Sequence, residues 1–233
     1  PIFGAGSVTP LQMARAYAVF ANGGYLIEPY FIKKIVDDRG NILGEARPAG
    51  AGDKALRVID PRNAFIMDNL LKDVTRYGTA ARVARLKRHD LAGKTGTTNE
   101  FVDAWFAGYQ PGLVGIAWVG YDQPRSLGRN QTGGAVALPI WIDFMQQALK
   151  QLPVMPFEIP DDILFVRIDT ETGLLPPQED GHGTVEIFAR GTEPKQAAPA
   201  RIQPTDFYKL DAYDDSSTRP TPFTPSPQDL AAF

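Results

Sequence analysis

Residues 91–121, LAGKTGTTNEFVDAWFAGYQPGLVGIAWVGY, contain three runs of strand length joined by two short linkers. The runs are Leu91–Thr98, Ala104–Tyr109 and Val114–Tyr121. A connection between parallel strands needs a dozen or more residues, so linkers this short favour antiparallel pairing. The stretch therefore predicts an antiparallel meander at the centre of the fold.

Helix signals lie on both sides of this meander. Three segments open with proline in the first helical turn and carry apolar residues at a spacing of three to four: 10–21, 61–77 and 139–149. Thr9 and Gln12 add the pattern of a capping box to the first of them. The sequence thus predicts an α+β fold, an antiparallel sheet flanked by helices.

Composition divides the rest of the chain. The pattern predicts a hairpin from 30–36 and 42–43, a surface loop over 44–53, and two later strands at 163–168 and 185–188. Seven of the last forty residues, from Pro194 to Phe233, are prolines, so we expect this tail to be disordered. We expect three regions, at 1–153, 154–195 and 196–233: the main domain, a small β-rich extension and the proline-rich tail.

Several classes of function are disfavoured by composition. The formal net charge of −3 gives no pull toward nucleic acid, and no apolar run reaches the roughly 18 residues of a membrane span. The absence of cysteine excludes disulfides, zinc–thiolate sites and cysteine nucleophiles. The two histidines, His89 and His182, are far apart, so we expect neither a metal site nor a cofactor.

The chemistry centres on Lys94-Thr95-Gly96-Thr97-Thr98, which falls inside the first predicted strand. A lysine, small hydroxyls and a glycine would put polar groups on an exposed sheet face. A phosphate-binding loop is the competing interpretation of Gly93-Lys94-Thr95, but that motif needs glycine at position 88, where arginine stands. We therefore reject the nucleotide interpretation.

The residues around this motif resemble the third-motif strand of class A penicillin-binding proteins. The resemblance covers roughly residues 1–194 and rests on separated stretches at 6–24, 92–99, 103–109, 132–145, 172–174 and 191–194. The last two suggest the 1A subgroup of Gram-negative bacteria. The resemblance implies the fold of a penicillin-binding transpeptidase, incomplete in this chain. The whole protein is then expected to be a peptidoglycan D,D-transpeptidase that cross-links stem peptides through a serine acyl-enzyme and is inhibited by β-lactams. It is also expected to carry an N-terminal glycosyltransferase.

The resemblance also implies roles for the motif. Lys94 is the expected site cation, and the N–H of Thr97 is the expected oxyanion donor, so both are catalytic candidates. Thr95, Gly96 and Thr98 are expected to bind the D-alanyl-D-alanine substrate. The family's other motifs, Ser-x-x-Lys and Ser-x-Asn, do not occur at any of the five serines: 7, 126, 216, 217 and 226. We expect no nucleophile in this chain, and expect those motifs upstream of Pro1.

Three alternatives stay open: a D,D-carboxypeptidase, a β-lactamase-like hydrolase, and a non-catalytic fragment whose tail docks on other cell-wall proteins. The arginines and lysine between 76 and 88 could meet an anionic glycan or lipid, although a solvated helix face is the simpler interpretation. The resemblance places the protein at the periplasmic face of the inner membrane, anchored by an upstream segment. Its expected partners are stem peptides, β-lactams and other cell-wall synthesis proteins.

Overall fold

The computed structural model describes residues 6–177 and 183–199, so the predicted disordered tail lies almost entirely outside the described residues. The chain divides into two compact units. One comprises Pro1–Val166 with Val185–Glu193, and the other comprises Arg167–Thr184 with Pro194–Phe233. The three regions expected from composition stay a prediction.

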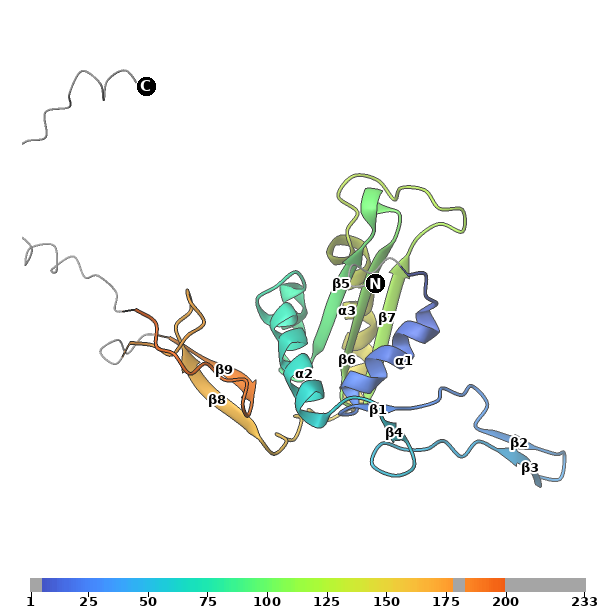
Figure 1. Cartoon of the computed structure of the whole chain (residues 1–233). Helices are drawn as coiled ribbons and strands as arrows, with labels where there is room; N and C mark the ends of the chain where they lie inside the picture. Colours follow the sequence, from blue (N-terminus) through green and yellow to red (C-terminus); the bar gives the residue numbers. More distant parts are fainter. Residues whose placement is uncertain (1–5, 178–182, 200–233) are drawn as a thin grey trace, which may run out of the picture. The chain divides into compact units, whose positions relative to one another are not determined.

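The predicted meander is confirmed. Strands β5 (Ala92–Thr97), β6 (Ala104–Gln110) and β7 (Leu113–Val119) form one antiparallel sheet in the order β5-β6-β7 (Figure 1). Within the described part of the chain, β5 and β7 each have one edge without a strand partner. The fold is therefore α+β, with the Lys-Thr-Gly motif on an edge strand.

Helix α3 (Leu138–Ala148) packs against one face of this sheet, after a π-helical turn at Gly133–Ala137. Its Trp141 is 1% exposed and donates from Nε1 to the carbonyl of Gly115 at 3.1 Å. The ring lies 4.9 Å from Phe106, centroid to centroid. This contact forms the centre of the hydrophobic core.

A row of three glycines makes room for the aromatic side chains on this face. Gly93, Gly108 and Gly115 lie directly opposite one another on the three strands. A Cβ at Gly108 would lie 2.8 Å from the Trp141 ring, and one at Gly115 would lie 2.7 Å from its Nε1. Real Cβ atoms do not approach this closely, so α3 can settle on the sheet only because these side chains are missing.

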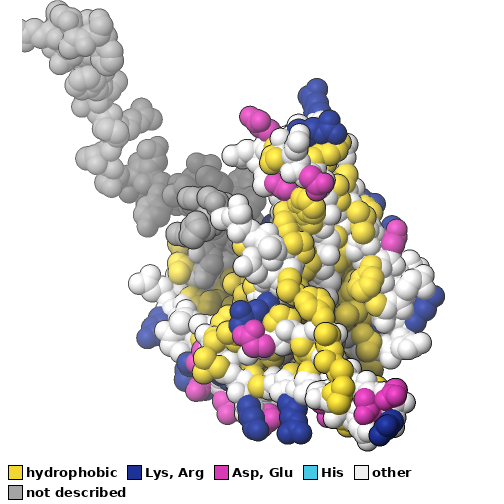
Figure 2. Space-filling view, turned by 90° about the vertical axis from the view of Figure 1, so that its right-hand side faces the viewer, with side chains coloured by type: hydrophobic (Ala, Val, Ile, Leu, Met, Phe, Trp, Pro, Cys, Tyr) yellow, Lys and Arg dark blue, Asp and Glu magenta, His cyan; other side chains and the backbone are white. Residues whose placement is uncertain are grey.

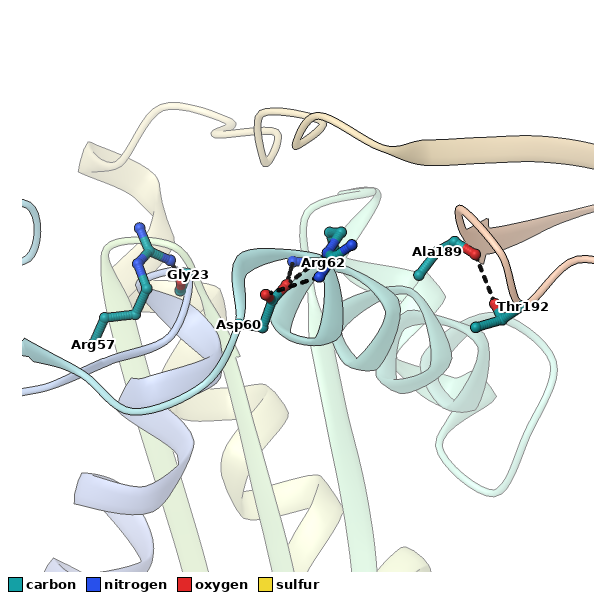
Figure 3. Close-up of polar contacts among 6 residues, drawn as sticks. All are labelled: Gly23, Arg57, Asp60, Arg62, Ala189 and Thr192. Carbon is teal, nitrogen blue, oxygen red and sulfur yellow. Dashed lines mark hydrogen bonds and ion pairs between the residues drawn. The ribbon is translucent and has the colours of Figure 1, made fainter.

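Helices α1 (Pro10–Ala21) and α2 (Pro61–Arg76) contact the sheet through Tyr109, whose side chain points to the face opposite Trp141. The predicted capping box of α1 is present, with both of its hydrogen bonds. Helix α2 begins after Asp60, which accepts from the N–H of Arg62 at 2.9 Å (Figure 3).

Three short strand pairs complete the described fold: β1 (Tyr25–Leu26) with β4 (Leu56–Arg57), β2 (Lys34–Val36) with β3 (Ile42–Glu45), and β8 (Ile163–Ile168) with β9 (Thr184–Ala189). The hairpin and the last two strands were predicted. The β1–β4 pair was not, and β3 extends into the expected loop. Figure 3 shows Arg57, whose Nη1 donates to the carbonyl of Gly23 at 2.6 Å and so joins β4 to the loop after α1. The same figure shows Thr192, whose hydroxyl donates to the carbonyl of Ala189 in the turn after β9.

Hydrophobic side chains gather in a band on the face turned to the viewer in Figure 2, the side on which α1, β7 and the β2–β3 hairpin lie in Figure 1. The hairpin region contributes strongly exposed side chains, with Phe31 86% and Leu43 69% exposed. An exposed two-stranded hairpin has little apolar area to bury, so the hairpin adds less to the stability of this chain than the central sheet does.

The basic segment between 76 and 88 is only partly the solvated face expected from sequence. A short 3₁₀ helix spans Ala81–Leu86, and Arg85 pairs with Asp143 at the surface. Arg88, in contrast, is nearly buried and donates two hydrogen bonds of 2.9 and 2.6 Å to the fully buried carboxylate of Asp90. It also donates to the carbonyls of Leu152 and of the following residue, which joins the start of β5 to the segment after α3.

In the second unit, the described residues are held by a turn around Asp169. The Oδ1 atom of Asp169 accepts from the N–H groups of Glu171 and Thr172 at 3.1 and 2.9 Å. Leu175 forms a parallel bridge with Ala197. These contacts are local, as expected of a small unit with little core.

We predict that Gly108→Ala lowers the free energy of unfolding by about 1–3 kcal/mol, because the added methyl group meets Trp141 and the backbone of Ala92. Urea denaturation measures this change. Gly44→Ala is the matched control, since open space surrounds that strand glycine. Equal stability of the two variants would refute the tight contact between α3 and the sheet.

We predict that Asp90→Asn costs about 3 kcal/mol at neutral pH, because Arg88 would be left buried without its charge partner. Burial alone would raise the pKa of Asp90, but hydrogen bonds from Arg88 and the Met155 N–H hold it below its usual 3.8. The wild type therefore has the full stabilisation above pH 3.8, the usual pKa of the carboxyl in the unfolded chain. It loses this stabilisation as the pH falls from 3.8 through the lower pKa of the folded protein.

Denaturation of both proteins at pH 7 and at pH 3 checks this prediction. The difference in unfolding free energy should shrink at the lower pH. Asp143→Asn, which removes a surface ion pair with Arg85, should change little at either pH. A pH-independent difference for Asp90→Asn would show that the ion pair is not the cause.

Candidate active site

Strand β5 presents its free edge to solvent, with its backbone groups alternating in direction. The N–H of Thr98 donates to the carbonyl of Asp103 at 3.0 Å, so these two residues form a hydrogen-bonded pair. In an antiparallel ladder such pairs alternate with non-bonded ones, which makes Thr97 and Ala104 a non-bonded pair. The N–H of Thr97 therefore points away from β6, toward the free edge.

The polar side chains of the motif are divided between the two faces of the sheet. Lys94 and Gly96 share the face of Tyr109, whereas Thr95 and Thr97 point to the α3 side. Of the polar groups expected on an exposed sheet face, Lys94 thus lies on one face and Thr95 and Thr97 on the other, because successive side chains of a strand alternate. Lys94 is exposed, and its Nζ donates to the carbonyl of Thr95 at 3.0 Å.

The three threonines are each held by a neighbouring segment. Thr95 Oγ1 lies 2.8 Å from Thr79 Oγ1, just beyond α2. Thr97 Oγ1 accepts from the N–H of Gly133 at 3.0 Å, at the start of the π-helical turn. Thr98 Oγ1 accepts from the N–H of Asp103 at 2.7 Å. The second half of β5 and the residue after it are thus held by three side-chain hydrogen bonds.

All five predicted site residues line one open hollow of about 610 Å³, which we call the β5 hollow. Its other walls come from α1, the segment before α1, and strands β6 and β7: Gly6, Ser7, Val8, Met13, Tyr17, Asp103, Trp105, Ala107 and Trp118. Lys94 and Asp103 are the charged side chains among them. The structure therefore brings the whole predicted set together and adds residues that lie far from the motif in sequence.

Ser7 lies near the motif in space, since Ser7 and Lys94 both line the β5 hollow. No hydrogen bond joins them in the described part of the chain, and Ser7 has no lysine three residues later. Ser126 lies elsewhere, in a loop where its hydroxyl donates to the carbonyl of Glu100 at 2.7 Å.

The floor of the hollow rests on a buried polar group. Tyr17, which lines the hollow, packs edge-on against Tyr109 at 6.3 Å. Tyr109 donates to the buried Asp68 at 3.0 Å, and Asp68 pairs with Lys72 at 2.6 Å. Burial raises the pKa of Asp68 despite these partners, and burial together with the Asp68 charge raises the pKa of Tyr109. Both phenol and carboxylate therefore act here as fixed hydrogen-bonding groups.

The residues that sequence reasoning missed are Asp103, Trp105 and Trp118. Their signal was present in the strand register, because Trp105 lies directly opposite both Gly96 and Trp118.

Over the described ranges, no cluster of three metal-binding side chains occurs, and no helix has the length and apolar character of a membrane span.

Several known proteins are similar to this chain in sequence. The family described as penicillin binding protein transpeptidase domain matches residues 3–146. Penicillin-binding protein 1A of Neisseria lactamica is 47% identical over 161 residues, which cover 69% of this chain and 20% of that protein. Penicillin-binding protein 1A of Vibrio cholerae is 39% identical over 83% of this chain and 29% of its own length.

A solved structure gives the same result. The crystal structure of penicillin-binding protein 1A from Haemophilus influenzae aligns with a TM-score of 0.78 and 40% identity, over 83% of this chain and 34% of that one. The chain thus spans between a fifth and about a third of the length of these relatives. The family match covers more than half of the chain, and the relatives agree with it in sequence and fold: the chain belongs to the transpeptidase family of penicillin-binding proteins.

Proposed function

We propose that the β5 hollow is one half of the active site of a peptidoglycan D,D-transpeptidase. The observation that carries the proposal is the free edge of β5, where the N–H of Thr97 points outward beside the Lys94 ammonium in an open hollow. An extended peptide can add to such an edge as a further strand, and a donor aimed at a reacting carbonyl stabilises the oxyanion that forms there.

Each residue has a distinct role in this proposal. The N–H of Thr97 stabilises the oxyanion, and Lys94 sets the positive potential beside the nucleophile. The side chains of Thr97 and Thr95 bind the terminal carboxylate of the D-alanyl-D-alanine donor, Thr98 contacts the same substrate, and Gly96 lets it approach the strand. Because Thr97 and Thr98 are tied to Gly133 and Asp103, these groups keep their positions before substrate binds.

The nucleophilic serine, its lysine base and the middle motif belong, in this proposal, to a longer polypeptide of which this chain is a part. A serine acts as a nucleophile only beside a base, and no described serine has one. The longer polypeptide would also carry the glycosyltransferase and work at the periplasmic face of the inner membrane. Its partners would be stem peptides, β-lactams and other cell-wall synthesis proteins.

We predict that Lys94→Ala, placed in the longer polypeptide that contains the serine, slows acylation by penicillin and peptide cross-linking by about 10²–10³-fold, because one preorganised charge is lost. Stopped-flow acylation and a cross-linking assay measure the two rates. Lys54→Ala, outside the hollow, should leave both unchanged. An acylation rate close to wild type for Lys94→Ala would remove this lysine from the mechanism.

We predict that the 233-residue chain by itself forms no covalent adduct with a fluorescent penicillin, because none of its serines is followed three residues later by the lysine that would act as base. Gel fluorescence and intact-protein mass spectrometry detect the adduct. The Ser7→Ala variant tests the described serine that shares the hollow with Lys94. Stoichiometric labelling that vanishes in this variant would make Ser7 the nucleophile and contradict the proposal.

A further inference from the structure

A carboxylate and two tryptophans form one wall of the β5 hollow. Asp103 Oδ1 accepts from Trp118 Nε1 at 2.9 Å, which fixes the carboxylate beside the indole ring. Trp105 lies directly opposite Trp118, with ring centroids 6.0 Å apart and a tilt of 43°. Trp118 is 39% exposed, so this wall faces the hollow and is open to a ligand.

The wall depends on a glycine that leaves room for it. A Cβ at Gly120 would lie 2.3 Å from the Trp118 ring and 3.0 Å from Asp103 Oδ1. A side chain at that position would push the indole off the carboxylate. The backbone of Asp103 is fixed as well, by its two hydrogen bonds with Thr98.

The charge of Asp103 has no cationic partner among the described residues. Its Oδ1 is used by Trp118, whereas its Oδ2 makes no hydrogen bond there. The other charged side chain of the hollow, Lys94, forms no ion pair with it and instead donates to the carbonyl of Thr95. The hollow therefore carries one positive and one negative charge that remain separate.

We propose that Asp103, Trp105 and Trp118 form a subsite for a primary ammonium group carried by a peptide substrate. An ammonium donates to a carboxylate and is attracted to the face of an indole ring, and this wall offers both. The inference rests on the proposed function, since transpeptidation joins an acyl donor to the amino group of a second peptide. Lys94 and Asp103 would then orient opposite charges of the substrates.

The three tryptophans of the chain provide a direct test of binding. Indole N–H signals in a ¹H–¹⁵N spectrum are followed while acetyl-L-lysyl-D-alanyl-D-alanine is added to this chain. We expect the signals of Trp105 and Trp118 to move, and that of Trp141 to stay, because its Nε1 is buried on Gly115. Trp141 thus reports in the same spectrum that the core is folded.

Charge recognition is tested with matched ligands and variants. The same peptide acetylated at its side-chain nitrogen should bind roughly fivefold to tenfold more weakly, the size expected of a partly exposed charge pair with a cation–π contact. Asp103→Asn keeps an oxygen acceptor for Trp118 and should reduce the discrimination to the part that the indole rings supply, about twofold to threefold. Asp38→Asn removes the same charge outside the hollow and should preserve it. Equal binding of both peptides to the wild type would overturn the subsite.

Kinetics of the longer polypeptide that contains the serine show whether the ammonium group belongs to the acceptor peptide or to the donor peptide. If the group belongs to the acceptor, Asp103→Asn lowers the ratio of aminolysis to hydrolysis of the acyl-enzyme and leaves penicillin acylation unchanged. If it belongs to the donor, the variant slows acylation by amine-bearing peptides alone. An unchanged ratio together with unchanged peptide acylation refutes the inference. Failure of penicillin acylation in the wild type would instead refute the proposed function.

Discussion

The structure depends on the contact between Trp141 and two cross-strand glycines, Gly108 and Gly115. The indole ring lies this close to the sheet because neither residue has a side chain, and Gly93 beside them leaves room for Phe106 in the same way. This contact fixes the position of α3. Because side chains alternate along each strand, the same contact also decides which residues face the other way. It thereby directs Lys94 toward the β5 hollow.

The candidate site is held from several directions by short contacts. Thr97 is tied to the π-helical turn before α3, and Thr98 to the start of β6. The Arg88–Asp90 pair joins the start of β5 to the segment after α3. An edge strand with a free row of backbone groups is normally prone to slip or to pair wrongly. Here the strand is fixed at both ends, so its outward N–H groups can serve binding.

Much of the fold could be predicted from sequence, because its signals are local. The capping box at Thr9 and the short linkers between 91 and 121 require no information from distant residues, and both predictions are confirmed. The β1–β4 pair was missed because each strand has two residues, too few for a pattern. Arg88 was expected in solvent. Its partner Asp90 is only two residues away, but Asp90 is buried by the segment after α3, which is distant in sequence.

For the site, the sequence alone determined the motif Lys94–Thr98, its place on a strand, and the absence of a serine followed by a lysine three residues later. These are properties of neighbouring residues. Only the tertiary structure decided that the Lys94 face of the strand borders the β5 hollow while Thr97 meets the turn before α3. It also decided that Ser7 shares the hollow with Lys94 and that Asp103 meets two tryptophans there. Strand register and helix packing bring together residues far apart in the chain, and neither can be derived from a local pattern.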